Sequence, residues 1–480
     1  MSLLNTNIGP ERVQVFDQPI GTVQLPGVAT SVTAFLISTS HVGAPVQTAT
    51  AVTSFSDFVS AFGTADEVAD DGYYAVEGFF NNAGTGNTAI IVNVGTSPTA
   101  ADYIGNASNG HGLRALDNQD VVGLVCAPGL PINLALLVQP AVIDYTKTIR
   151  SEFGATLTTS FSVLSVPKEI EKANKEVAML APIIITSIAS NVLQLPSTNL
   201  STIKPGMVVV KAGVYTATIT AVNDGLDQVT VAALNGLAPS DSITLSMPSA
   251  ITWKDQVVND PSRVSAWYFN SVIMLDESST ALPGDLKTID PVGHIAGVMA
   301  RIDANNSIGG VSHAPAGIQY AGLAGIQGLA LKLSERIDAE PLRLAFINRL
   351  TGFPGSGNVI FGGYTNGGAL VTADEQLIQV MRSLQFIKGS LERGLKGFLW
   401  ENFSPVTQLE VKGAIESFLR SNIHLFPAGL QEAQQFKVIS VEPTQNELDQ
   451  GLLKVRIQVR PNKAVRFIEI SLEYPIPTTA

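Results

Sequence analysis

Gly27-Val-Ala-Thr-Ser-Val-Thr-Ala-Phe-Leu-Ile-Ser38 is a largely apolar run that predicts a buried β-strand. Thr53-Ser-Phe-Ser-Asp-Phe-Val-Ser-Ala-Phe62 follows, and its aromatic residues at 55, 58 and 62 have the spacing of one helix face. Gly63 ends this helix, residues 71–80 predict a second one, and residues 88–94 predict another strand. A strand, helices and a strand in this order predict an α/β fold.

The alternation continues outward from this opening. Further strands are expected at 120–127, 161–166 and 265–275, and helices near 141–153 and 168–181. The uncharged run 121–143 has the length of a membrane span, but its prolines would break a spanning helix, so we expect a strand followed by a loop. Strands that alternate with helices predict a mainly parallel, doubly wound sheet. We assign 27–181 and 249–340 to this discontinuous domain.

A different texture fills residues 182–248. Short Val- and Thr-rich runs are separated by Pro-Gly, Asn-Asp-Gly and Asn-Gly turn signals, and aromatic residues nearly vanish. We predict a small all-β module inserted into the α/β domain. The two ends of the insertion should lie close together because the larger sheet resumes after it.

Residues 341–461 predict a C-terminal α+β domain. Thr372-Ala-Asp-Glu375 is a capping box, and an apolar face follows it at residues 377, 380, 381, 384, 387 and 391. Ser404-Pro405 is a cap followed by proline at the first helical position. The buried face of that helix is expected to contain Leu409, Ile415, Phe418 and Leu419.

Alternating strands occur at both ends of the chain, and we predict that they form linking arms at 1–26 and 462–480. In the segment 453–460 that precedes the C-terminal arm, every second residue is apolar, and residues 466–474 repeat the pattern. Residues 11–16 form a short counterpart between Pro10 and Pro19. A terminal strand can pair with the free edge of another subunit's sheet. The residues expected to make these inter-subunit strands are Val13, Val15, Phe16, Val455, Ile457, Val459, Phe467, Ile468, Ile470 and Leu472.

Charge and cysteine content exclude several classes of protein. The net charge is −12, which argues against nucleic-acid binding because phosphate contacts need a basic face. Charged residues make up only 15%, which suits a chain that hides surface in subunit contacts. Cys126 is the single cysteine and predicts a buried thiol, not a disulfide. The first residues lack the pattern of a signal peptide, so we expect synthesis and assembly in the cytoplasm, without membrane insertion.

No constellation of residues predicts chemistry. The five histidines lack metal-ligand spacing, so no metal site is expected. Gly352-Phe-Pro-Gly-Ser-Gly357 has no Lys-Ser/Thr after it, which favours a loop over a phosphate cradle. Asn109-Gly-His-Gly112 is similar to the histidine neighbourhood of subtilisin-like proteases, but no matching serine segment occurs. We therefore predict no catalytic residue, no cofactor and no enzymatic activity.

Six blocks, in order, resemble contractile tail sheath proteins. They begin with residues 26–36, 52–63 and 75–84, and continue with Pro291 to Asp303 before Ala314-Pro315-Ala316. The last two are residues 352–365 and the paired helical segments 386–402 and 415–420. The chain departs from the family at Gly309-Gly310 and Ser312-His313, where bulkier residues are more usual, and Gly362-Gly-Tyr364 stands where Trp-Gly-Ala is more common.

The resemblance implies a structural subunit of a bacteriophage tail or related contractile injection system. Such subunits stack as rings around an inner tail tube protein, contact baseplate and tail terminator proteins, and contract to drive the tube through a target envelope. The resemblance also implies a subtilisin-like middle domain without protease activity, arms that pair with neighbouring C-terminal domains, and an outward-facing insertion. Two alternatives remain open, a degenerate subtilisin-type hydrolase and another self-assembling shell or surface-layer protein.

Overall fold

A computed structural model describes residues 25–69, 71–149, 159–173, 183–196, 203–211, 214–246, 248–257, 262–333, 339–440, 444 and 450–466. The chain divides into two compact units. The larger, here called the α/β unit, comprises the described residues within 27–389, 424–429 and 461–466. The smaller, here called the C-terminal unit, comprises those within 25–26, 390–423 and 430–460.

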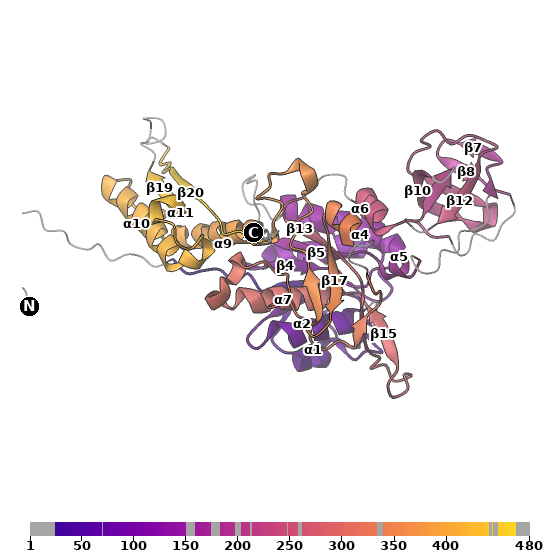
Figure 1. The fold of residues 1–480 in the computed structure, drawn as a ribbon, viewed down its shortest axis with the longest axis horizontal. Helices are drawn as coiled ribbons and strands as arrows, with labels where there is room; N and C mark the ends of the chain where they lie inside the picture. The colour runs from indigo at the N-terminus through magenta and orange to yellow at the C-terminus, as the bar shows by residue number, and fades with distance from the viewer. Residues whose placement is uncertain are drawn as a thin grey trace, which may run out of the picture. The chain divides into compact units, whose positions relative to one another are not determined.

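The α/β unit is built on a mixed sheet of eight described strands, most of them parallel. Helices cover both faces of this sheet (Figure 1). Only the edge strands, β2 and β18, run antiparallel to their neighbours. The spatial order is β18 (Gly357–Phe361), β17 (Ile347–Phe353), β13 (Ser265–Phe269), β5 (Phe161–Ser165), β4 (Leu124–Cys126), β1 (Thr33–Ile37), β3 (Ala89–Asn93) and β2 (Ala49–Val52).

Successive residues of the central strands feed two separate cores. Phe35 and Ile37 of β1 point into one core, and Ala34 and Leu36 point into the other. This is the period-two alternation of a strand buried on both faces. The first core is covered by α1 (Phe55–Phe62), α2 (Gly72–Ala83) and α7 (Val292–Asp303). The second is covered by α3 (Ala100–Ile104), α4 (Ile132–Asp144), α6 (Ala250–Val257) and α8 (Ala339–Leu344).

Helices α2 and α7 pack with their backbones nearly touching. A Cβ added at Gly293 would lie 1.9 Å from the carbonyl oxygen of Ala75, and one at Gly297 would lie 2.5 Å from that of Phe79. Gly78 of α2 gives the same clearance to the fully buried ring of His294. The crossing therefore depends on glycine at these positions.

Three secondary-structure predictions were wrong in instructive ways. Residues 265–275 form two strands, β13 and β14 (Val272–Leu275), which belong to different sheets. They are separated at Asn270, whose φ is 91° and whose side-chain amide donates to the carbonyls of Leu331 and Leu350. The loop expected before residue 141 is instead α4, in which burial of Ile132, Ala135, Val138 and Val142 outweighs the interior Pro140. The capping box at Thr372 closes a turn, and α9 (Ile378–Gly394) starts later.

The predicted domain boundary at 341 also differs from the structure. Strands β17 and β18 pair into the large sheet, β17 parallel to β13, so that residues 341–389 belong to the α/β unit. Pairing between strands so distant in sequence leaves no local signal. A three-stranded sheet completes this unit, with β15 (Leu286–Ile289), β14 and β16 (Gly328–Leu329) in that order.

The segment 183–246 forms a separate antiparallel sheet around its own apolar core. It lies on the connection between α5 (Lys168–Ala173) and α6. The first strand, β6, pairs with the last, β12, so the two ends of the segment are adjacent, as expected. The spatial order is β6 (Ile183–Ile184), β12 (Ser242–Ser246), β9 (Val208–Lys211), β10 (Val214–Asn223), β11 (Gln228–Val231), β8 (Val192–Gln194) and β7 (Ser187–Ala189).

Among its described residues, the C-terminal unit contains a pair of strands that lies beside helices (Figure 1). Ser404 caps α10 (Pro405–Ser421) by accepting from the Thr407 amide, which confirms the predicted helix start. Ile415, Phe418 and Leu419 are buried as expected, but Leu409 is 62% exposed. The other elements are α11 (Glu432–Gln435), β19 (Phe436–Ser440) and β20 (Val455–Val459).

Candidate assembly site

The carboxyl ends of the parallel strands carry a closed polar network. Open α/β sheets usually hold their ligands at this edge. Here Lys168 Nζ, just after β5, donates to Asp71 Oδ1 at 2.7 Å, and Asp71 Oδ2 accepts from the Asp290 amide at 2.8 Å. Asp290 in turn accepts from Ser165 Oγ at 2.6 Å and from the Gly129 amide at 2.9 Å.

This network ties helices to strands. Asp71 and Asp290 lie just before α2 and α7, and both carboxylates are buried. Burial raises the pKa of Asp290, which its hydrogen bonds partly oppose. Ser165 is also buried and already donates to Asp290, so it is not presented as a nucleophile. These hydrogen bonds hold the starts of α2 and α7 against the ends of the strands, which is a structural role.

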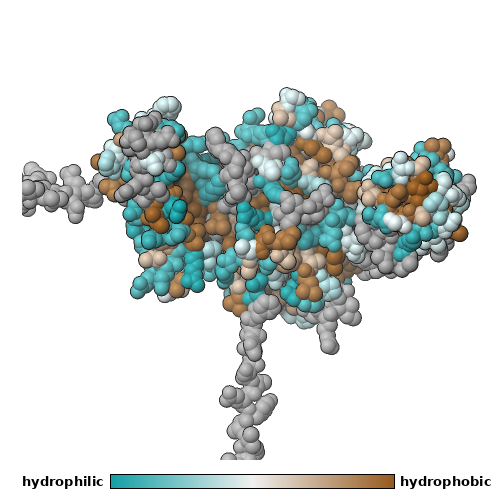
Figure 2. Space-filling view, turned by 90° about the horizontal axis from the view of Figure 1, so that it is seen from above, coloured by the Kyte–Doolittle hydropathy of each residue, from teal (hydrophilic) through white to brown (hydrophobic). Residues whose placement is uncertain are grey.

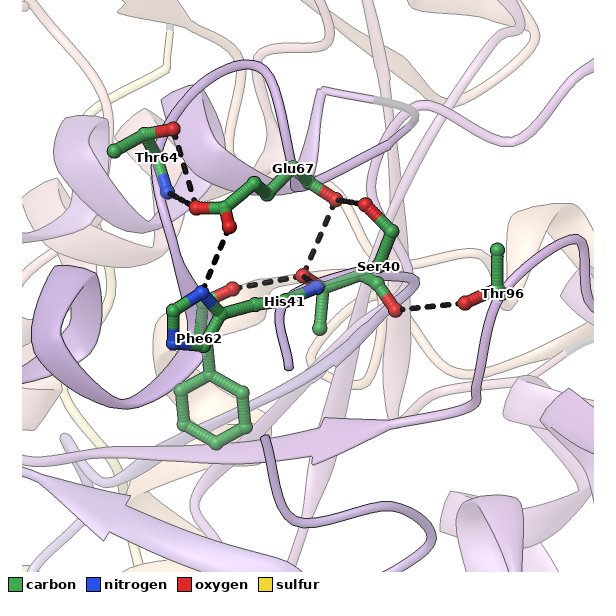
Figure 3. Close-up of polar contacts among 7 residues, drawn as sticks. Ser40, His41, Phe62, Thr64, Glu67 and Thr96 are labelled. Atoms are coloured by element: carbon green, nitrogen blue, oxygen red, sulfur yellow. Dashed lines mark hydrogen bonds and ion pairs between the residues drawn. The ribbon is translucent and has the colours of Figure 1, made fainter. Parts of the chain in front are cut away.

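A histidine–carboxylate pair follows β1 (Figure 3). His41 Nδ1 lies 2.9 Å from Glu67 Oε1, and Glu67 Oε2 accepts from the backbone amide of Thr64 at 2.9 Å. The Thr64 amide is the main cause, and His41 the next, that holds the pKa of Glu67 below its usual value. Ser40, the nearest labelled serine, donates to the backbone oxygen of Glu67. The pair therefore fastens the turn at 64–67 to the end of β1.

The other candidate sites from the sequence are also structural. The glycine-rich segment 352–357 is the turn between β17 and β18, where the Ser356 amide donates to the carbonyl of Phe353. Burial raises the pKa of the Cys126 thiol. Across the described part of the chain, no three His, Cys, Asp or Glu residues group as a metal site would require. Nor does any described helix have the length and apolarity to cross a bilayer.

The two-stranded sheet of β19 and β20 is the least complete element. Phe436 faces Val459, Val438 faces Ile457 and Ser440 faces Val455 across the antiparallel pair. Phe436 and Val438 of β19 are buried, and β19 packs against α10 and α11. Val455, Ile457 and Val459 share this apolar face but are only half-buried.

Within the described ranges, β19 and β20 form a two-stranded sheet and pair as strands only with each other. The opposite face carries exposed Lys437, Arg456 and Gln458. A sheet of two strands is marginal on its own in water, and its edges are templates for further strands. The geometry is suited to strand addition from another chain.

The predicted arm residues fall into two groups. Val455, Ile457 and Val459 lie in β20, where the alternation predicted a strand with one buried side. The other seven lie outside the described residues, and they are Val13, Val15, Phe16, Phe467, Ile468, Ile470 and Leu472. Sequence reasoning missed β19, although Phe436-Lys-Val-Ile-Ser440 carries apolar residues at 436 and 438.

Exposed apolar side chains occur in both units. In the C-terminal unit, Leu399 and Trp400 precede α10, and the Trp400 side chain is fully exposed at a φ of 72°. In the α/β unit, the most exposed large apolar side chains are Val42, Leu370, Val465 and Leu282. Figure 2 shows apolar areas interspersed with hydrophilic ones on the visible face.

Comparison with known proteins places the fold. No protein family and no curated protein matches the sequence. The structure is similar to a chain of the extracellular contractile injection system PVC sheath complex in its contracted state, with a TM-score of 0.61, 15% identity and coverage of 97% of this chain and 98% of that chain. It is also similar to a chain of the contracted helical sheath of the anti-feeding prophage, with a TM-score of 0.60, 17% identity and coverage of 97% and 99%.

A chain of the six-fold symmetrised anti-feeding prophage baseplate gives a TM-score of 0.60 at 16% identity, with coverage of 98% of this chain and 100% of that chain. These likenesses extend over nearly the whole of each chain. The mixed α/β fold described above is therefore the fold of subunits in contractile sheath and baseplate assemblies.

Proposed function

We propose that this chain is a structural subunit of a contractile tail sheath. The observation that carries the proposal is the full-length likeness to sheath chains of two contractile systems. In this proposal the subunits polymerise as helically stacked rings around an inner tube and contract to drive the tube through a target envelope. The closed polar network at the carboxyl edge of the sheet supports a structural role over an enzymatic one.

Linkage between subunits is proposed to be strand addition. The outer edges of β19 and β20 would accept the N-terminal arm, residues 1–26, and the C-terminal arm, residues 462–480, of neighbouring copies. Each backbone hydrogen bond of an added strand contributes about 0.5–1.5 kcal/mol net. Burial of the half-exposed face of Val455, Ile457 and Val459 adds to this. Such a tether holds subunits together while their bodies move.

In this proposal, contraction requires no nucleotide hydrolysis. The bodies of the subunits exchange one set of surface contacts for a more favourable set, and the difference in free energy drives shortening. The extended state is held by the tube and the baseplate during assembly. No cofactor or nucleotide enters this mechanism.

The remaining parts have proposed roles of their own. Outside residues 182–248, the α/β unit is assigned to a subtilisin-like domain without protease activity, and the module within 182–248 to the outer surface of the sheath. The partners are further copies of this chain, the tube protein, and the baseplate and terminator proteins. The particle is a phage tail or an injection device that assembles in the cytoplasm of the producing cell.

Negative-stain electron microscopy of the purified chain tests the proposal. We expect hollow, striated cylinders, whereas flat lattices would indicate a surface-layer protein. Deletion of residues 1–20 or 462–480 should leave folded subunits that form no cylinders. Normal cylinders from either truncation would reject the arm linkage. Deletion of 183–246 is the matched control, because removal of an outward module should leave assembly intact.

A further inference from the structure

The hairpin of β14 and β15 ends in a rigid tip that presents an uncovered leucine. Leu282-Pro-Gly-Asp285 forms a turn in which the Asp285 amide donates to the Leu282 carbonyl at 2.9 Å and Gly284 has a φ of 94°. Proline followed by glycine is the sequence that this type of turn favours. Asp285 Oδ2 also accepts from the Leu282 amide at 2.9 Å. The turn therefore fixes the backbone at Leu282, whose side chain is 71% exposed.

The base of the same hairpin is anchored to the body of the α/β unit. Tyr73 and Tyr74 of α2 donate to Glu277 Oε2 at 2.8 Å and to Asp276 Oδ1 at 2.9 Å. Asp66 accepts from the Ser279 amide. These bonds fix the loop before binding, so docking it elsewhere costs little conformational entropy. Leu275 and Leu286, both exposed, extend the apolar surface beside acidic side chains.

An apolar pocket with a cationic rim lies elsewhere on the α/β unit. It has a volume of about 240 Å³, and its walls include Ile347, Phe361 and Leu377. That volume is below the range of about 300–1,000 Å³ typical of sites for small molecules, and it suits one or two side chains. Arg343, paired with Glu340, and the exposed Arg466 also line the pocket.

The pocket contains an unsatisfied polar group. Gln379 lines it, is 1% exposed, and finds no hydrogen-bond partner among the described residues for either its amide nitrogen or its amide oxygen. A buried unpaired amide is costly, so it points to a missing partner. A primary amide offers one acceptor and donors side by side, which complements the N–H and C=O of a peptide backbone. Arg349, also in the lining, stacks on the ring of Phe361, 5.0 Å from its centroid.

We propose that the Leu282 tip of one subunit docks into this pocket of a neighbouring copy. The inference rests on the proposed function, which supplies the second copy. Leu282 would fill the apolar pocket, the turn backbone would pair with Gln379, and Asp276, Glu277 and Asp285 would face the arginines. Opposite charges on the two surfaces select this orientation. Because the two patches differ, the contact is head-to-tail, which builds helical filaments or rings.

Crosslinking of two single-cysteine populations tests the contact. One population carries Thr280→Cys, which leaves Leu282 intact, and a tagged one carries Ala464→Cys in the pocket lining. The native Cys126 is buried and does not react. After mixing, assembly and treatment with a short bis-maleimide, we expect a tagged heterodimer. Leu282→Ser in the Thr280→Cys chain should lower its yield about tenfold, because the buried leucine is lost.

The outcomes separate the two proposals. Cylinders without a heterodimer would overturn the docking contact and leave the sheath proposal standing. Failure to form cylinders would overturn the sheath proposal, and a heterodimer that still forms at high protein concentration and depends on Leu282 would support the contact. As a second readout, Gln379→Leu should raise the Tm of the subunit while lowering crosslinking several-fold. Unchanged crosslinking would exclude Gln379 from the contact.

Discussion

The two units of this chain differ in how far the faces of their sheets are buried. In the α/β unit, the parallel strands are buried on both faces, and the backbone of residues 317–323 bonds along part of the outer edge of β18. In the C-terminal unit, β19 and β20 pair as strands only with each other among the described residues, and the β20 side of their apolar face is half-buried. The first sheet is covered on both faces by its own chain, and the second has one face exposed and the other only partly buried. The comparison teaches that the folding core and the assembly surface occupy different elements.

The largest expected effect on the free energy of unfolding is in the α/β unit. Gly293→Ala places a Cβ 1.9 Å from the Ala75 carbonyl and forces α7 away from α2. We expect a loss of about 3 kcal/mol or more in the free energy of unfolding, measured with urea. Gly413→Ala in α10 is the matched control, since nothing lies within 4 Å of its Cβ, and it should be neutral or stabilising. Equal effects of the two substitutions would show that the crossing is loose.

Low pH should also destabilise the α/β unit. Burial of His294 lowers its pKa to about 4. In the unfolded chain His294 is protonated below about pH 6.5, whereas in the folded chain it stays neutral down to about pH 4. The free energy of unfolding therefore falls as the pH drops through this window. The loss is roughly 3 kcal/mol. His294→Leu should remove this part of the slope in unfolding experiments between pH 7 and 4, and a slope unchanged from wild type would contradict the assignment.

A smaller effect concerns the anchor of the docking hairpin. Burial, and then Glu277, raise the pKa of Glu77 to about 7. A raised carboxyl pKa means that stability falls as the pH rises from about 4.5 to 7. Glu77→Gln should therefore stabilise the protein by about 1 kcal/mol at pH 8, allowing for solvent screening, and by nothing near pH 4.5. A gain that is the same at both pH values would show that ionisation is not the cause.

The smallest effect on the stability of the isolated subunit is expected in the sheet of β19 and β20. Ile457→Thr removes part of a half-buried face, so the free energy of unfolding should fall by less than about 1 kcal/mol. Cylinder formation should nevertheless be lost. Val163→Ala in the large sheet is the converse control, because Val163 is fully buried and the change should cost more stability without blocking assembly. If the Ile457→Thr variant assembles normally, the sheet of β19 and β20 is not an interface between subunits.

Sequence reasoning succeeded where the signal was local. The aromatic spacing at 55, 58 and 62 predicted α1, the Ser404-Pro405 pair predicted the start of α10, and the alternation at 455–459 predicted β20. It failed where distant residues decide the outcome. Nothing near residue 341 indicates that β17 pairs with β13, and Asn270 breaks a continuous apolar run through bonds to residues 331 and 350.

The candidate sites followed the same rule. The half-buried strand at 455–459 could be identified from alternation, but its partner β19 was found only in the structure. The pocket brings together residues near 316, 347, 361, 379 and 466, which share no sequence pattern. Leu409 was expected to be buried because its spacing fits a helix face, yet no described element covers it.

A cryo-electron microscopy map of the assembled chain tests the central claim most directly. The quantity to measure is the number of strands in the sheet that contains β19 and β20. We predict that this sheet gains strands from residues 11–16 and 466–474 of neighbouring copies. A sheet that keeps only its own two strands, with both termini resting on their parent subunit, would contradict the account.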